Sequence, residues 1–323
     1  MKTLFDRQKS QAPISITDTD EAIFKALYDY DILSVEQLCT ELDKPSPQYM
    51  RKRLTSLFNA GYVARPPIQE VIFKHRTGAG SRPLVHSLGQ KGAAHLRDKF
   101  GYSLKTTNWD DKARNRSGVR GQAIFEHDLG ANGILIALRK AYATLDGVTV
   151  LGPKEIAEAS PQSTRRMDRP FSMPTKYIWP QENKMHQRNV IPDGSFVYQV
   201  TRENIQGSWM VFVEYDNDSM PLRRTRGDNT SIQQKIAAYI GLHKSGLVKQ
   251  RFGVNRFQVM FVTTGSQQHR AGMVAAAKEY IDSIRDKVPD SLVFFTTLDE
   301  FGGVGLDDKI WVTSEGRFRR MVG

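Results

Sequence analysis

The sequence has 323 residues, and its 46 Lys and Arg residues outnumber 35 Asp and Glu residues, giving a net charge of +11. This length is sufficient for two domains with ordinary cores, and the basic excess favours a polyanionic partner. The single cysteine, Cys39, excludes an internal disulfide and a cysteine-based zinc site. The chain starts without an apolar signal core and has no apolar run of membrane-spanning length. We therefore expect a cytoplasmic protein with no membrane partner.

Three short helices are predicted within the first 61 residues. Thr17 and Ser34 offer side-chain caps for the first two helices. The third helix follows Pro47 and ends at Gly61, which is a favoured residue beyond a helix end. Its spacing turns one apolar face inward, which consists of Met50, Leu54, Leu57 and Phe58.

Strand signals after the third helix, together with a basic hairpin over residues 71–86, are typical of a winged helix. In such a domain the third helix enters the major groove and the hairpin contacts the DNA backbone, although winged helices also bind proteins. A further helix over residues 87–96 completes the domain, which we place at residues 1–100. The residues expected to contact DNA are Gln48, Arg51, Lys52 and Thr55 on the third helix and Lys74, Arg76 and Arg82 on the hairpin.

Residues 101–122 are polar and basic, and they predict a linker that either lies along phosphates or is merely solvated. A helix is expected from Ile124 to about Ala143. Glu126 lies in its first turn, where an acidic side chain also favours the helix start. Residues 165–180 are interrupted by prolines and contain three arginines, which indicates an exposed loop.

The candidate chemistry lies between Ile191 and Tyr239. Asp193 opens one strand of an apparent hairpin, and residues 209–216 form a buried strand that ends on acidic residues. Because side chains alternate along a strand, Glu214 and Asp216 project to one face. Carboxylates gathered there raise one another's pKa unless they share a cation. Mg²⁺, or Mn²⁺, fits these oxygen ligands better than zinc does.

The helix after this strand places Ile232, Ile236, Tyr239 and Ile240 on an apolar face, with Lys235 at its edge. Residues 257–263 and 291–296 then predict two buried strands joined by a helix over residues 268–287. Such a β-α-β unit makes the two strands parallel.

This arrangement resembles the PD-(D/E)xK nuclease superfamily, which carries Pro-Asp on one strand and Glu-x-Lys on the next. Pro192-Asp193 and Glu214 match that pattern, whereas Asp216 stands where the lysine is expected. Some members carry the lysine on the next helix, where this chain has Lys235. The resemblance implies catalytic roles for Asp193, Glu214, Asp216 and Lys235. It also implies metal ligation by Asp193, Glu214, Asp216 and Glu126.

More narrowly, the whole chain looks like the replication-relaxation family of plasmids, conjugative elements and phages. The likeness rests on the winged-helix pattern, Pro192-Asp193-Gly194, residues 212–216, and Lys235 spaced four residues from Tyr239. It implies an α+β two-domain fold, with an N-terminal winged helix-turn-helix followed by a PD-(D/E)xK-like α/β/α core at residues 123–323. The implied partner is double-stranded DNA, with relaxase or replication proteins and a homodimer left open.

Two functions and one structural role remain open. The chain is either a Mg²⁺-dependent DNA nickase or endonuclease, or a catalytically inactive relaxosome or replication factor or transcriptional regulator that uses the same fold only to bind DNA. In the structural alternative, the acidic residues merely end a buried strand and pair with Arg223 or Arg224.

Overall fold

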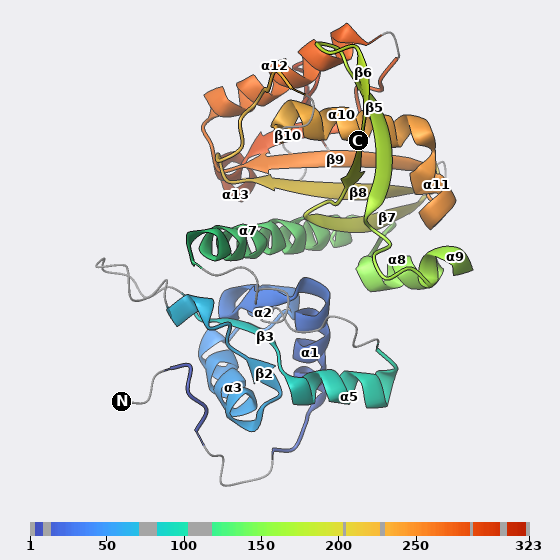
Figure 1. Cartoon of the computed structure of the whole chain (residues 1–323). Coiled ribbons are helices and arrows are strands. Elements are labelled where there is room, and N and C mark those ends of the chain that lie inside the picture. The colour runs from blue at the N-terminus through green and yellow to red at the C-terminus, as the bar shows by residue number, and fades with distance from the viewer. Residues whose placement is uncertain are drawn as a thin grey trace. The chain divides into compact units, whose positions relative to one another are not determined.

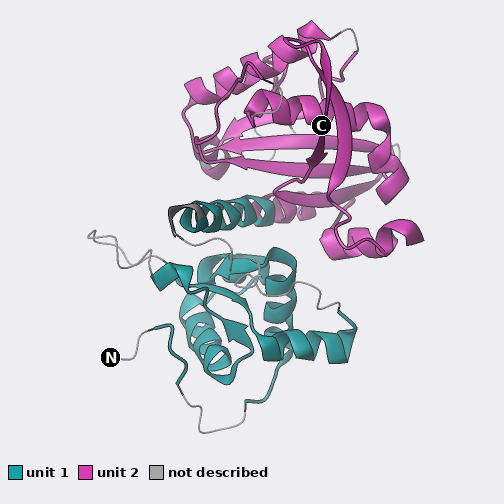
Figure 2. Cartoon of the chain, viewed as in Figure 1, with its two compact units in different colours: residues 1–136 teal, residues 137–323 magenta. Residues whose placement is uncertain are grey.

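The computed structural model describes residues 4–8, 14–70, 83–102, 118–202, 205–226, 230–284, 287–303 and 309–320. The chain divides into two compact units, residues 1–136 and 137–323, and the division falls within helix α7 (Gly118–Ala143) (Figure 2). Among the described residues, no helix combines the length and apolar character that a membrane span requires.

Unit 1 combines helices with a small antiparallel sheet (Figure 1). Its helices before α7 are α1 (Asp18–Tyr30), α2 (Val35–Glu41), α3 (Pro47–Ala60) and α5 (Gln90–Phe100). Its strands are β1 (Ile32–Ser34), β2 (Val63–Ala64) and β3 (Val85–Leu88), in the order β1-β3-β2. Residues 71–82, which include most of the predicted hairpin, lie outside the described residues.

The predicted helix starts in unit 1 are confirmed. Thr17 and Ser34 each accept a hydrogen bond from the backbone three residues later, so that α1 and α2 begin with capping boxes. Gly61 ends α3 with φ at 89°, a left-handed conformation that glycine adopts without strain. The predicted inner face of α3 is buried throughout: Met50, Leu54, Leu57 and Phe58.

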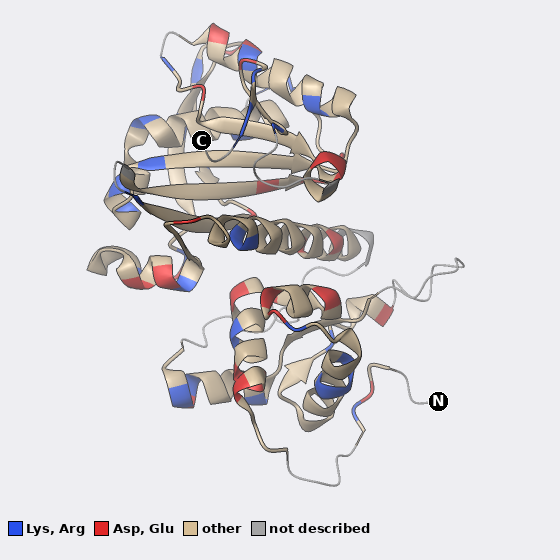
Figure 3. Ribbon diagram, turned by 180° about the vertical axis from the view of Figure 1, so that it is seen from behind, with Lys and Arg blue, Asp and Glu red and all other residues tan. Residues whose placement is uncertain are grey.

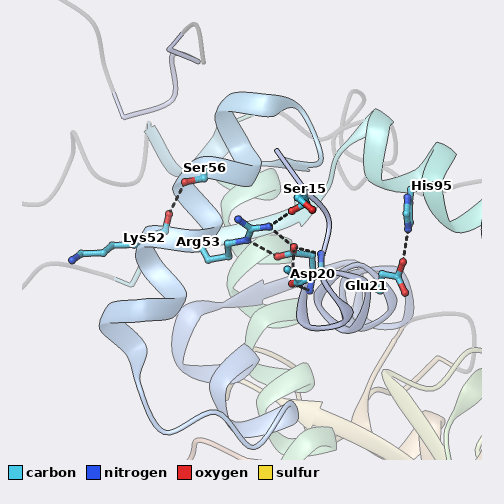
Figure 4. A network of polar contacts seen from close by, with 8 residues as sticks. Ser15, Asp20, Glu21, Lys52, Arg53, Ser56 and His95 are labelled. Atoms are coloured by element: carbon cyan, nitrogen blue, oxygen red, sulfur yellow. Dashed lines mark hydrogen bonds and ion pairs between the residues drawn. The ribbon is translucent and has the colours of Figure 1, made fainter. Parts of the chain in front are cut away.

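A buried ion pair joins α1 to α3 (Figure 4). Arg53 Nε donates to Asp20 Oδ1 at 2.7 Å, and its Nη2 donates to the Ser15 carbonyl at 2.8 Å. Burial raises the pKa of Asp20, but hydrogen bonds from Arg53 and Thr17 outweigh burial and lower that pKa below its ordinary value. Asp20 therefore caps its own helix and also anchors α3.

Unit 2 is built on a large mixed sheet (Figure 1). Its strands are β4 (Val148–Leu151), β7 (Gly194–Arg202), β8 (Ile205–Asp216), β9 (Arg256–Thr263), β10 (Val293–Thr297), β11 (Trp311–Thr313) and β12 (Phe318–Arg319). Their order is β12-β11-β10-β9-β8-β7-β4. The three central strands β8, β9 and β10 are parallel, whereas the pairs outside them are antiparallel.

Helices of unit 2 cover both faces of this sheet. They include α10 (Ile232–Ser245) and α12 (Gln267–Ser283) on one face, with α8 (Pro153–Ala159), α9 (Gln162–Arg165), α11 (Leu247–Phe252) and α13 (Leu298–Gly303) around the sheet. Phe212, Phe261 and Phe295 pack with the inner side of α10. On the other face, Tyr142 from the end of α7 packs against Phe196 and Tyr198.

The β-α-β unit predicted near the carboxyl end is confirmed, because α12 joins the parallel strands β9 and β10. The hairpin of β7 and β8 is confirmed as well. Helix α7 begins at Gly118 rather than at Ile124, so residues 118–122 are not a linker. Residues 103–117 of the expected linker lie outside the described residues.

The expected loop over residues 165–180 is wrong in part, because it contains strand β5 (Met173–Trp179). This strand pairs with β6 (Lys184–Val190) as a separate two-stranded ribbon. Buried and exposed residues alternate along β5, and its buried side packs on α10. Proline has no backbone N–H to donate. Pro174 is tolerated in β5 because a strand that pairs on one side only has positions whose backbone N–H needs no partner.

Candidate functional site

Asp193 lies beside the end of strand β8, as the sequence predicted. Gly194 of β7 pairs with Val213 of β8, and this antiparallel register brings Asp193 level with Glu214. The Tyr215 backbone N–H donates to Asp193 Oδ2 at 2.9 Å. The contact holds the Asp193 carboxylate at the edge where β8 ends.

Helix α10 supplies both partners of the Glu214 carboxylate. Glu214 is only 2% exposed. Lys235 Nζ forms an ion pair with its Oε2, and the Tyr239 hydroxyl donates to its Oε1. Residues four apart share a helix face, so Lys235 and Tyr239 reach the same carboxylate together. Lys235 therefore lies where the sequence placed it, at the edge of the apolar face and against the sheet.

The charges of this cluster shift one another's protonation. Burial raises the pKa of Glu214; Lys235 opposes that rise, and Asp193 adds to it. Burial by itself lowers the pKa of Lys235, but the carboxylates of Glu214 and Asp193 outweigh burial and raise that pKa above its ordinary value. Lys235 is thus held as an ammonium ion between two acidic residues.

Arg188 is a basic neighbour that sequence reasoning missed. It lies on β6, and its Nη1 donates to Gln234 Oε1 at 3.1 Å. Gln234 directly precedes Lys235 on α10, and the charge of Arg188 acts against the rise in the pKa of both Lys235 and Tyr239. In the sequence, Arg188 lies only five residues before Asp193. That closeness could have indicated a site residue only if strand β6 had been recognised.

Asp216 joins a different group of side chains. Its Oδ2 accepts a hydrogen bond from Thr263 Oγ1 at 2.8 Å and lies 2.9 Å from His269 Nε2. The other ring nitrogen of His269 lies 2.8 Å from Asp218 Oδ1. Asp216, Asp218 and His269 offer ligand atoms within 4.8 Å of one another, close enough to hold a metal ion. The structure thus brings Asp193, Glu214 and Lys235 together and directs the Asp216 carboxylate elsewhere.

Sequence reasoning missed His269 and Asp218. The sequence contained a signal for this group of side chains, because β8 and β9 are adjacent parallel strands whose carboxyl ends meet at one edge of the sheet. Asp216 ends β8 at that edge, Asp218 follows it, and His269 lies in the first turn of the helix after β9.

The structural alternative that paired these acidic residues with arginine is wrong for Glu214. Its ion-pair partner is Lys235. Arg223 instead pairs with Glu279, with Nε 2.6 Å from Oε2, and Arg224 is exposed. Glu126, the remaining expected metal ligand, lies on α7 in unit 1, where its Oε1 accepts a hydrogen bond from Gln122 at 3.3 Å.

The expected DNA-contacting residues of α3 are all exposed, and Lys and Arg positions appear as blue segments on the ribbon of this helix in Figure 3. These residues are Gln48, Arg51, Lys52 and Thr55. Arg51 forms an exposed ion pair of 2.8 Å with Glu36, and Thr55 accepts a hydrogen bond from Arg65 at 3.1 Å. The expected hairpin residues Lys74, Arg76 and Arg82 lie outside the described residues.

Comparison with known proteins identifies one matching family model. The model, described as replication-relaxation, matches residues 24–256, which is more than half of the chain. No curated protein and no solved structure matches the chain. The matched range includes α3 of unit 1 and the Asp193, Glu214 and Lys235 cluster of unit 2.

Proposed function

The chain belongs to the replication-relaxation family, and from that membership we propose that it acts on the DNA of a mobile genetic element. In this proposal, unit 1 binds duplex DNA as a winged helix. Unit 2 is a PD-(D/E)xK-like domain that nicks DNA at the cluster of Asp193, Glu214 and Lys235. The family suggests a role in replication or in mobile-element processes, and the two units supply the physical basis for a more specific assignment.

The element order of unit 1 supports the winged-helix assignment. Helix, strand, two helices and two strands follow one another from α1 to β3, and the three strands form one antiparallel sheet. In that fold the third helix is inserted into the major groove. The outward side of α3 carries Gln48, Lys52 and Thr55, whose amide, ammonium and hydroxyl groups suit base edges and phosphates.

The observation that carries the nicking proposal is the ion pair between Lys235 and Glu214 beside Asp193. A phosphodiester gains negative charge as it is attacked, and a fixed ammonium lowers the energy of that charge. Lys235 provides such an ammonium, because the carboxylates keep it protonated. Arg188, which lies near Lys235, provides a second positive charge to orient the phosphate.

The carboxylates of this edge fit the ions expected from the sequence. Asp193 and Glu214 offer the hard oxygen ligands that Mg²⁺ takes, so the donor set suits Mg²⁺ at that pair. The group of Asp216, Asp218 and His269 adds an imidazole nitrogen to two carboxylates, which suits a transition-metal ion better than Mg²⁺. When bound, such an ion supplies Lewis-acid polarisation of the phosphate and an activated water.

A second function is favoured by one specific observation. Both oxygens of Glu214 are already engaged by Lys235 and Tyr239, and the residue is 2% exposed. A carboxylate whose two oxygens are both engaged is also expected in an inactive domain, where Glu214 and Lys235 form a structural ion pair. In that case the chain is an accessory factor of replication or of the relaxosome, and it uses the same fold only to bind DNA.

The two functions are separated by incubating the purified chain with supercoiled plasmid in Mg²⁺, Mn²⁺ or chelator. The nicking proposal expects open circular product with metal and none with chelator. Asp193→Asn keeps an oxygen that can accept the Tyr215 hydrogen bond but removes the charge, so nicking is expected to fall at least 100-fold with unchanged folding.

Asp282→Asn is the matched control, because Asp282 is an exposed carboxylate on α12 that pairs with Lys278. This variant is expected to nick like the unaltered chain. Duplex binding without cleavage under either metal assigns the chain to the accessory role. Cleavage that persists in Asp193→Asn removes this cluster from the chemistry.

A further inference from the structure

A cavity of about 450 Å³ lies on the sheet of unit 2, away from the acidic cluster. Tyr198 pairs with Trp209, and the register across β9 and β10 places Gln258 and Phe294 on the same sheet face. Glu214 follows Trp209 by five positions on β8, so the two side chains project to opposite faces. They are also separated by about 16 Å along the strand.

The wall of the cavity is aromatic. Tyr198 and Trp209 stack with ring centroids 5.3 Å apart and planes only 5° from parallel. Trp209 also lines a second cavity of about 180 Å³, together with Arg256. The Arg256 guanidinium lies 5.7 Å from the Trp209 ring centroid. Trp209 therefore borders two neighbouring cavities, and Arg256 lines the smaller one.

Two polar atoms that line the larger cavity lack partners. Gln258 Oε1 and Asp290 Oδ1 are buried without a hydrogen-bond partner among the described residues. Leaving such an acceptor unsatisfied is unfavourable, and both side chains line the cavity, so a donor from a bound molecule stabilises a rotamer that turns either oxygen into the cavity. The other oxygen of Asp290 faces Arg317 at 3.6 Å and Arg319 at 3.8 Å.

The larger cavity also has basic lining residues. Arg319 and Arg320 line it and are exposed. Aromatic walls beside basic side chains are the common means by which proteins hold single-stranded nucleic acid, since rings contact bases and arginines contact phosphates. The volume lies within the range of roughly 300–1,000 Å³ that small-molecule sites occupy.

We propose that this cavity binds a nucleotide of single-stranded nucleic acid whose base carries an exocyclic amino group. The base lies against the aromatic wall, and Arg320 contacts the phosphate. The side chains of Gln258 and Asp290 turn so that their acceptors receive hydrogen bonds from the amino group. The second cavity beside Trp209 accommodates the adjoining nucleotide, which favours a strand over a free nucleotide. The site is distinct from the proposed nicking cluster and does not depend on cleavage.

Fluorescence anisotropy of labelled 15-mers with the full chain tests this site. Adenine and cytosine 15-mers are expected to bind more tightly than a thymine 15-mer. Arg320→Ala removes an exposed side chain without disturbing the core and should weaken 15-mer binding about fivefold, while Trp209→Leu should weaken it about tenfold. Gln258→Leu should reduce the preference for amino-bearing bases. Duplex binding should remain unchanged in all three variants.

Lys249→Ala, an exposed charge removal on α11, is the control for general electrostatics and is expected to have no effect on the 15-mers. The proposal is overturned if both Arg320→Ala and Trp209→Leu bind the 15-mers as tightly as the unaltered chain. It is also overturned if Lys52→Ala abolishes 15-mer binding, which would place the strand on unit 1. Deoxyadenosine monophosphate that binds as tightly as the adenine 15-mer overturns the strand assignment.

Discussion

Lys235 on α10 and Glu214 near the end of β8 form an ion pair in which the carboxylate is buried and the lysine is partly buried. Their side chains are 20% and 3% exposed. Removing both charges from water is costly, and their mutual attraction together with the Tyr239 hydrogen bond offsets that cost. The pair is therefore sensitive to the loss of either member, whatever its role in catalysis.

Lys235→Met is expected to lower the free energy of unfolding by about 3–5 kcal/mol, because it leaves the Glu214 charge buried without its cation. Denaturant unfolding followed by circular dichroism measures this loss. The double variant Glu214→Gln/Lys235→Met removes both charges and should regain most of the stability. A double variant as unstable as Lys235→Met would show that packing of the lysine stem, rather than charge pairing, dominates.

The buried side chain of His86 is expected to make unit 1 less stable in acid. Its ring lies in β3 without a hydrogen-bond partner among the described residues, and burial lowers its pKa from 6.5 to about 3. Below pH 6.5 the unfolded chain binds a proton that the folded chain excludes, so stability falls as pH falls. The loss is about 1.4 kcal/mol per pH unit until about pH 3.

His86→Leu should remove this pH dependence. The difference in unfolding free energy between pH 7 and pH 4.5 is expected to shrink by about 2–3 kcal/mol relative to the unaltered chain. Denaturant titrations of both proteins at the two pH values give this difference. Identical pH dependence in the two proteins would mean that His86 accepts a proton without unfolding unit 1.

Lys52→Ala is expected to weaken duplex DNA binding and to lower the slope of log affinity against log salt by about one, as loss of one phosphate contact does. Gel shifts or anisotropy over a salt series measure both quantities. Lys249→Ala, on α11 of unit 2, is the charge-matched control. Equal losses in the two variants would indicate that net charge alone, rather than α3, determines affinity.

Gly241→Ala is expected to destabilise unit 2 by about 1–3 kcal/mol through overpacking. A Cβ atom at this position of α10 would lie 2.3 Å from the Lys176 carbonyl oxygen of β5, and that backbone atom cannot move without shifting the ribbon. Thermal unfolding of Gly302→Ala provides the comparison, because nothing lies within 4 Å of a Cβ at Gly302. Similar melting temperatures for Gly241→Ala and the unaltered chain would contradict the close approach.

Local interactions explain which elements of this chain were predictable. Capping boxes act over three residues, so Thr17 and Ser34 mark the starts of α1 and α2 by themselves. The apolar face of α10 follows from helical spacing, which also placed Lys235 at its edge. Strand β5 was missed because Pro174 within it and the prolines on either side were interpreted as breaks, although buried and exposed residues alternate along it.

The sequence by itself determined the caps and the periodicities, because these depend on neighbours within one or two turns. Only the tertiary structure decided which side chains meet. His269 reaches Asp216 across 53 positions, and Arg188 reaches Gln234 across 46. Such contacts depend on strand register and helix placement, and a shift of one residue in a strand turns its side chains to the other face.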